Sequence, residues 1–121
     1  MEKNYPSSAK VVVIGGGVAG TSCAYHLAKF GWKDIVLLER DQLTSGTTWH
    51  AAGLLGQLGA SSTITKIRKY SLDLYKELEK TTGLSTGLKQ NGAITVASSK
   101  ERMQELLRQA TTAQLSNVEV E

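Results

Sequence analysis

The run of glycines at residues 15–20 constrains the fold of this chain more than any other feature, because an apolar segment precedes it and a helical one follows. Residues 10–14 are a short, β-branched, apolar run, which predicts a buried parallel strand covered on both faces. Residues 18–30 have a helical period that stops at Gly31. A second apolar strand is predicted at residues 34–38, so the front of the chain forms a parallel β-α-β unit.

The glycines match the pattern G-x-G-x-x-G, and each has a role at a dinucleotide site. Gly15 permits a sharp turn after the strand, and Gly17 lets the backbone approach a pyrophosphate. Gly20 lets the helix and the strand pack closely. The start of the helix, at Val18 and Ala19, offers unpaired N–H groups and a positive dipole end to the phosphates.

An acidic residue completes this pattern. Glu39 follows Gly20 by 19 residues, at the end of the second predicted strand. Its carboxylate can accept hydrogen bonds from both ribose hydroxyls and repels the 2′-phosphate of NADP. A glycine-rich turn without a ligand can look similar, but the agreement of strand, turn, helix and acid favours a dinucleotide site. NAD and FAD both carry ADP, so the motif leaves both cofactors open.

Residues 40–62 differ from the ordinary crossover helix that follows the second strand of an NAD-binding fold. They are rich in small and hydroxylic residues, which suit a segment that lies against a large flat ligand. Side-chain bulk is missing at Gly46, Ala51, Ala52, Gly53 and Gly56. Hydroxyls that can donate to phosphate or ribityl oxygens belong to Ser45, Thr47 and Thr48. This segment favours FAD over NAD.

Residues 10–59 resemble the FAD-dependent amine dehydrogenases of the D-amino-acid oxidase superfamily, in the sarcosine and dimethylglycine dehydrogenase group. The similarity is carried by the first strand with its glycines, by residues 37–40 (LLER) and most specifically by residues 43–54 (LTSGTTWHAAGL). Residues 55–58 (LGQL) are more similar to the sarcosine dehydrogenase and bacterial methylamino-acid oxidase branches than to the dimethylglycine branch. Motif and resemblance together assign FAD binding to Gly15, Gly17, Val18, Ala19, Gly20, Glu39, Arg40, Ser45, Gly46, Thr47, Thr48, Trp49, His50, Ala51, Ala52, Gly53 and Leu54.

In that group the histidine of this segment is the point of covalent flavin attachment, which implies attachment at His50. A neutral imidazole is nucleophilic near pH 7, so a histidine at the dimethylbenzene edge of the flavin can attack an activated methyl carbon. Trp49 forms either part of the core or a wall beside the flavin. His26 is interpreted as structural, and Cys23 as a small buried hydrophobic residue.

The resemblance implies an oxidoreductase that oxidises the C–N bond of a secondary or tertiary N-methyl amino acid by hydride transfer to flavin. Oxygen or an electron-transfer protein would accept the electrons. Tetrahydrofolate would bind only in a C-terminal domain outside this chain. The catalytic and substrate-binding residues stay unassigned, because no pair of residues resembles a clamp for a substrate carboxylate or a base beside the amine.

Two alternatives stay open. A non-catalytic homologue, similar to the regulatory subunit of pyruvate dehydrogenase phosphatase, matches residues 24–29 (AYHLAK) and 31–34 (GWKD). The Trp–His pair is not kept in that branch, so Trp49 and His50 favour the enzyme. A free-standing NAD-binding module is the other alternative, and residues 40–62 argue against it.

Composition excludes several further classes. The single cysteine excludes a disulfide scaffold and cysteine-ligated zinc, and we expect no metal. The net charge of +3 comes from basic residues mixed with acids along residues 64–82, which indicates a solvated helix rather than a nucleic-acid surface. No apolar run approaches the roughly 20 residues of a membrane helix. Without a signal peptide we expect a cytoplasmic protein, or a mitochondrial matrix protein if a eukaryotic N-terminus has been processed or truncated.

The expected organisation is a disordered leader at residues 1–9, then the N-terminal part of a Rossmann-like FAD-binding domain of the α/β class at residues 10–85. Residues 86–121 would begin the strand and helix region that leads to a substrate domain. Within these parts we predict an amphipathic helix at residues 64–82, ended by Gly83.

The last part of the chain is predicted to hold extended structure within residues 87–97, most strongly at 93–97. A capping box formed by Ser98 and Glu101 opens a helix that ends near residue 115, and residues 117–121 alternate like a strand. A doubly wound sheet does not close on two or three strands. We therefore expect a truncated fragment that is marginally stable and inactive alone.

Overall fold

The computed structural model describes residues 5–121. By its internal contacts the chain divides into two compact units, one ending at Gly53 and one from Leu54 to Glu121. Of the predicted leader, residues 1–4 lie outside the described residues, and residues 5–9 hold no helix or strand. The predicted domain boundary at 85/86 concerns a complete flavin domain and stays a prediction.

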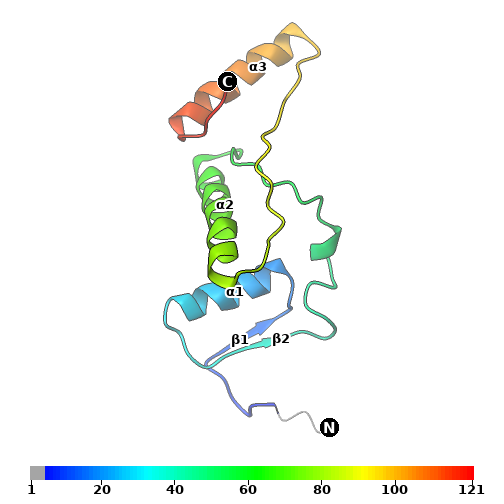
Figure 1. The fold of residues 1–121 in the computed structure, drawn as a ribbon, viewed down its shortest axis with the longest axis vertical. Coiled ribbons are helices and arrows are strands. Elements are labelled where there is room, and N and C mark those ends of the chain that lie inside the picture. The colour runs from blue at the N-terminus through cyan, green and yellow to red at the C-terminus, as the bar shows by residue number, and fades with distance from the viewer. Residues whose placement is uncertain (1–4) are drawn as a thin grey trace. The chain divides into compact units, whose positions relative to one another are not determined.

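The first unit is a β-α-β unit: β1 (Val11–Ile14), α1 (Val18–Lys29) and β2 (Ile35–Leu38). The two strands are parallel, with Val11 opposite Ile35 and Ile14 opposite Leu38. Figure 1 shows α1 lying across one side of this strand pair, and it contacts both strands. The predicted parallel β-α-β fold is confirmed.

Gly31 ends α1 in the predicted way. It has a φ of +85°, and its N–H donates to the Ala28 carbonyl at 2.9 Å. The Trp32 N–H donates to the Leu27 carbonyl at 3.0 Å. This pair of bonds is a Schellman motif, which satisfies carbonyls that the last helical turn leaves unpaired.

Close packing of α1 against the end of β1 depends on Gly20. A Cβ atom at this position would overlap the Gly15 carbonyl oxygen and lie 3.4 Å from Cγ1 of Val13. No other residue type fits without moving the backbone. The predicted role of Gly20 in helix–strand packing is confirmed.

Two burial predictions for this unit are wrong. Cys23 is exposed, and so are Ala19 and Phe30 of the same predicted stripe, because no part of residues 5–121 covers this side of α1. The strands are covered on one face, not two: Val12, Ile14 and Leu38 are 50%, 85% and 42% exposed. Within residues 5–121, α1 is the helix that contacts both strands, which leaves the other face open.

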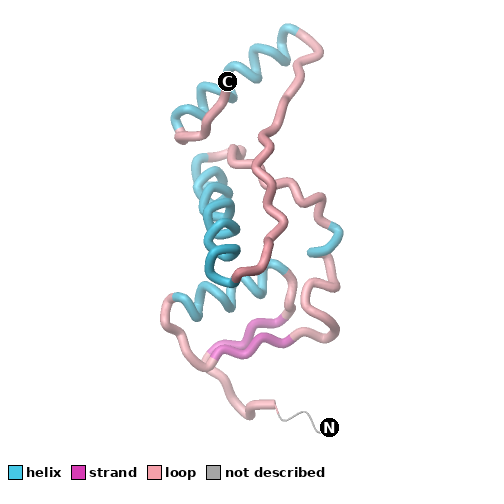
Figure 2. The backbone as a smooth tube through the Cα atoms, viewed as in Figure 1, coloured by secondary structure: helices cyan, strands magenta, loops and turns pink. Residues whose placement is uncertain are grey.

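The second unit contains α2 (Ser62–Thr82) and α3 (Lys100–Leu115), which Figure 2 shows as two separate helices joined by a long loop. Ser61 caps α2 by accepting a hydrogen bond from the Ile64 N–H at 3.3 Å. Gly83 ends the helix with a φ of +68°, and its N–H donates to the Glu79 carbonyl at 3.0 Å. The predicted helix is confirmed and begins two residues earlier than expected.

The end of α3 is tied to α2 through Lys69. Its Nζ donates to the carbonyls of Ser116 at 3.0 Å and Asn117 at 2.8 Å, 47 and 48 residues further along the chain. The amine satisfies carbonyls at a helix C-terminus and complements the negative end of the dipole. Ala113 and Val118 are buried beside this contact, at 0% and 8% exposure.

Two predictions for the last part of the chain are wrong. The cap of α3 is Ser99, which accepts from the Arg102 N–H at 3.1 Å, so the predicted capping box of Ser98 and Glu101 does not form. The strands predicted at residues 93–97 and 117–121 are absent from the described chain. A strand requires a hydrogen-bonded neighbour, and Ile94, for example, is 94% exposed.

No helix within residues 5–121 combines the length and the apolar character that crossing a bilayer requires.

Gly20→Ala tests the packing of α1. The added methyl group must displace the Gly15 carbonyl, so the variant should lose about 1–3 kcal/mol of unfolding free energy. Gly46→Ala is the matched control in the same unit, since a Cβ there meets no atom within 4 Å. Thermal unfolding followed by circular dichroism measures both. Equal unfolding midpoints for the two variants would contradict the close approach of the Gly15 carbonyl to Gly20.

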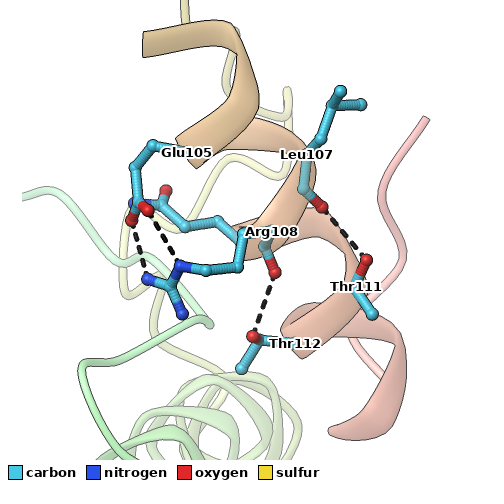
Figure 3. A network of polar contacts seen from close by, with 6 residues as sticks. Glu105, Leu107, Arg108, Thr111 and Thr112 are labelled. Atoms are coloured by element: carbon cyan, nitrogen blue, oxygen red, sulfur yellow. Dashed lines mark hydrogen bonds and ion pairs between the residues drawn. The ribbon is translucent and has the colours of Figure 1, made fainter. Parts of the chain in front are cut away.

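The Glu105 carboxylate accepts several hydrogen bonds on the surface of α3, and their effect on stability can be tested by changing the pH. Arg108 donates to it through Nε at 2.8 Å and Nη2 at 2.7 Å, as Figure 3 shows, and Gln109 donates at 2.9 Å. These bonds lower the pKa of Glu105 to about 2. Because the folded-state pKa is depressed, the stabilisation is full above the ordinary pKa of 4.5 and disappears as the pH falls towards 2.

Glu105→Gln should therefore lower the helicity and the unfolding midpoint slightly at pH 7, and most of this difference should be gone at pH 2. The effect is small because the pair is exposed to solvent. Glu119→Gln removes the same charge from an exposed position outside α3. A pH-independent difference between the Glu105 variant and the parent protein would contradict this account.

Candidate functional site

The turn after β1 has the geometry of a phosphate-binding loop. Gly15 has a φ of +102°, and its N–H donates to the Leu38 carbonyl at the end of β2, at 2.8 Å. Few residues other than glycine adopt this φ. A Cβ at Gly17 would lie 3.0 Å from the hydroxyl oxygen of Thr48. The missing side chain at Gly17 therefore leaves room for the Thr48 hydroxyl in front of α1.

The start of α1 holds N–H groups that an anion could use. Thr21 is the first residue whose N–H reaches a helical carbonyl, that of Gly17, at 3.0 Å. The Val18 N–H donates to Oγ1 of Thr48 at 2.9 Å. Within residues 5–121 the structure shows no acceptor for the N–H groups of Ala19 and Gly20. Free donors at the positive end of a helix dipole fit the pyrophosphate of a dinucleotide.

Glu39 lies at this loop as an ionised acceptor. Its Oε2 accepts from the Gly16 N–H at 2.7 Å, and its Oε1 from the Asp41 N–H at 3.1 Å. These amides, Gly16 first, hold the pKa of Glu39 below its usual value, and the charge of Arg40 adds to the effect. Each oxygen keeps a further lone pair, so the carboxylate can still accept from two hydroxyls.

The segment after β2 folds back over the glycine loop. A Cβ at Gly16 would lie 2.5 Å from Cδ2 of Leu43, and the Thr44 N–H donates to the Gly16 carbonyl at 3.0 Å. Leu43 and Thr44 were not among the predicted site residues. Thr44 has a φ of +69°. Threonine rarely adopts a positive φ, so the sequence gives no signal for this conformation.

Thr48, Trp49 and His50 form a short 3-10 turn, η1 (Thr48–His50). The Trp49 Nε1–H donates to the Ser45 carbonyl at 3.0 Å, and the His50 N–H to the Thr47 carbonyl at 3.1 Å. Trp49 is 67% exposed, so within the described residues it is not part of a core.

The hydrogen bond of the His50 ring indicates which ring nitrogen carries the proton. Nδ1 lies 3.2 Å from the Gly46 carbonyl oxygen, and a carbonyl only accepts, so Nδ1 carries the proton. In a neutral imidazole the lone pair is then on Nε2. His50 is exposed, which leaves this nitrogen accessible.

The structure brings part of the predicted site together. The glycine loop, the start of α1, Glu39 and Thr48 are in direct contact. The rest of the predicted set is solvent-exposed and, within residues 5–121, makes no side-chain hydrogen bond to the loop: Arg40, Ser45, Gly46, Thr47, Trp49, His50, Ala51, Ala52, Gly53 and Leu54. Leu54 begins the second unit and is 89% exposed. The residues in contact fit the ADP part of FAD, because they combine an open turn, free N–H groups and an ionised acceptor.

A metal centre is not indicated. Residues 5–121 contain no group of three or more His, Cys, Asp or Glu side chains placed to hold an ion. Two basic residues of α2 have structural partners: Lys69 binds the carbonyls after α3, and the Arg68 guanidinium donates to the Leu58 carbonyl at 2.5 Å.

The chain is similar to several curated proteins over most of its length. It is 48% identical to the mitochondrial sarcosine dehydrogenase of Homo sapiens over 115 residues, which are 94% of this chain and 12% of that protein. It is 47% identical to the mitochondrial pyruvate dehydrogenase phosphatase regulatory subunit of Mus musculus, over 85% of this chain and 12% of that protein. It is 46% identical to the mitochondrial dimethylglycine dehydrogenase of Homo sapiens, over 91% of this chain and 13% of that protein.

The chain spans only 12–13% of the length of these relatives. Residues 10–121 match the family described as DAO, FAD dependent oxidoreductase. The chain therefore belongs to the family of FAD-dependent oxidoreductases, and its residues correspond to the N-terminal region of the sarcosine and dimethylglycine dehydrogenase group.

Proposed function

We propose that this chain is the FAD-binding segment of an enzyme that oxidises the C–N bond of a secondary or tertiary N-methyl amino acid. The observation that carries the proposal is the segment from Glu39 to His50. It places a carboxylate and a hydroxyl on the glycine loop and ends in an accessible imidazole nitrogen. When bound, the flavin supplies the two-electron acceptor for the amine.

The start of α1 and the segment from Glu39 to His50 each have a proposed role toward the cofactor. The N–H groups of Ala19 and Gly20 would bind the pyrophosphate, and the Thr48 hydroxyl, which accepts from Val18, keeps its own hydrogen for a phosphate oxygen. The Glu39 carboxylate would accept from the ribose hydroxyls. Its hydrogen bonds to two amides keep it ionised at neutral pH and orient it.

His50 is proposed as the point of covalent attachment through Nε2. Nε2 would form the bond to a methyl carbon of the flavin, and the imidazole would lose its Nδ1 proton, which lies beside the Gly46 carbonyl. The bound flavin would supply the acceptor for the two electrons and two protons released by this bond formation, and dioxygen would then take them up as hydrogen peroxide. The link would fix the cofactor and raise its reduction potential.

The substrate class rests on the relatives. Sarcosine dehydrogenase and dimethylglycine dehydrogenase are named for N-methylated glycines, which supports a small N-methyl amino acid here. Oxygen or an electron-transfer protein would reoxidise the flavin. No residue of this chain is proposed to touch the amine. The names of both relatives include "mitochondrial", which supports that location over the cytoplasmic one if the source is eukaryotic.

A regulatory protein is the second candidate, and the 47% identity to the phosphatase regulatory subunit supports it. Such a protein could keep the fold and the glycine loop without redox chemistry. The exposed Trp49–His50 turn favours the enzyme, because a purely structural role does not require an accessible imidazole nitrogen. Covalent flavin distinguishes the two candidates.

The first test is acid precipitation of the flavin-loaded protein. The wild-type pellet should stay yellow, and His50→Ala should release essentially all flavin into the supernatant while still binding FAD before the acid is added. His26→Ala is the control, because His26 lies within α1 and its Nδ1 bonds to the Ser22 carbonyl at 2.7 Å. A colourless wild-type pellet would refute covalent attachment and favour the regulatory candidate.

The second test concerns Glu39. In the His50→Ala background, Glu39→Gln should weaken FAD binding about tenfold or more, since hydrogen bonds to a charged acceptor are replaced by weaker ones. Asp41→Asn is the matched control, because it removes a neighbouring charge and keeps the backbone N–H that Glu39 accepts. Quenching of flavin fluorescence on titration gives the dissociation constants. Equal affinities for the two variants would exclude Glu39 from the ribose site.

A further inference from the structure

The indole of Trp49 lies directly against the imidazole of His50. The two ring centroids are 3.8 Å apart and the planes are inclined by 33°. The indole is itself anchored, because its Nε1–H donates to the Ser45 carbonyl at 3.0 Å. Both side chains thus bond back to the carbonyl four residues earlier, Trp49 to Ser45 and His50 to Gly46.

The imidazole has few other restraints. Within residues 5–121 its ring has one hydrogen bond, at 3.2 Å to Gly46, and one ring contact, with Trp49. A single hydrogen bond of this length leaves an exposed side chain free to change rotamer. The ring contact with the indole is the second restraint on the imidazole.

We propose that Trp49 is the positioning residue for covalent flavin attachment, an inference that rests on the proposed role of His50. Its indole holds the imidazole with Nδ1 on the Gly46 carbonyl, which leaves Nε2 to form the bond to the flavin. The same face stabilises the positive charge that develops on the imidazole while Nε2 forms its bond to the flavin methyl carbon. Trp49 does not accept or donate a proton in this step.

Two substitutions separate the ring contact from the indole hydrogen bond. Trp49→Phe keeps an aromatic face but loses the bond to Ser45, and Trp49→Leu loses both. We expect Trp49→Leu to slow the formation of acid-stable flavin about tenfold or more, and Trp49→Phe to slow it about threefold. Both variants should still bind FAD before precipitation, since the indole N–H of Trp49 bonds to Ser45 and not to the glycine loop.

Trp32→Leu is the matched control, because it removes the other tryptophan, which is 52% exposed, and keeps the backbone N–H that ends α1. Each protein is incubated with FAD, and acid-stable flavin is measured against time. Total bound FAD is measured before precipitation.

A flavin-free measurement tests the ring contact by itself. In Trp32→Phe protein, Trp49 is the remaining tryptophan of the sequence. An imidazole in contact with an indole alters the fluorescence of the indole, so the emission of this protein should change when His50→Gln is added. Unchanged emission would contradict the ring contact. Rescue of the attachment rate by Trp49→Phe, but not by Trp49→Leu, is the signature of a ring contact.

The outcomes distinguish this inference from the proposed function. Wild-type attachment rates in both Trp49 variants would overturn the positioning role and leave attachment at His50 intact. Loss of all bound FAD in both variants would also overturn it, because Trp49 would then belong to the binding site. No acid-stable flavin in the wild-type protein would refute attachment itself, and the inference with it.

Discussion

The close approach of α1 to the end of β1 is the contact on which the rest of the first unit depends. Gly20 has no side chain at the point where the Gly15 carbonyl meets the helix. This proximity places the start of α1 at the carboxyl end of β1, beside the end of β2. The free N–H groups of the helix and the Glu39 carboxylate therefore meet at one edge of the strand pair, where ligands of open α/β sheets bind.

The segment after β2 is held by polar bonds to that edge rather than by a core. Thr44 and Thr48 bond to Gly16 and Val18, and the turn that follows is closed by bonds to carbonyls four residues earlier. Small and hydroxylic residues suit this arrangement, since they allow the backbone to lie close to the loop. An amphipathic helix in the same place would need an apolar surface to cover.

Local signals in the sequence predicted most of the regular structure, and contacts between distant residues account for what was missed. Gly31 and Gly83 end their helices as expected, because a positive φ strongly favours glycine. The cap of α3 is Ser99 and not the predicted Ser98, because two adjacent serines give the same local capping signal. Residues 93–97 have a strand composition but no partner within the described chain, and composition does not supply one. At the site, the glycine loop and Glu39 follow from their motif, whereas the positive φ of Thr44 and the ring contact of Trp49 follow from the folded segment alone.

Thr48 takes part in two structures at once. Its hydroxyl accepts from the first N–H of α1, and its backbone begins the turn that carries His50. A change at this residue alters the helix end and the turn together, so its energetic effect cannot be divided between phosphate binding and flavin attachment. Substitutions at Thr48 and at either partner should be non-additive, as for any residue shared by two networks. The helix end proposed to bind the phosphates and the turn that carries the proposed attachment histidine are thus joined by one residue.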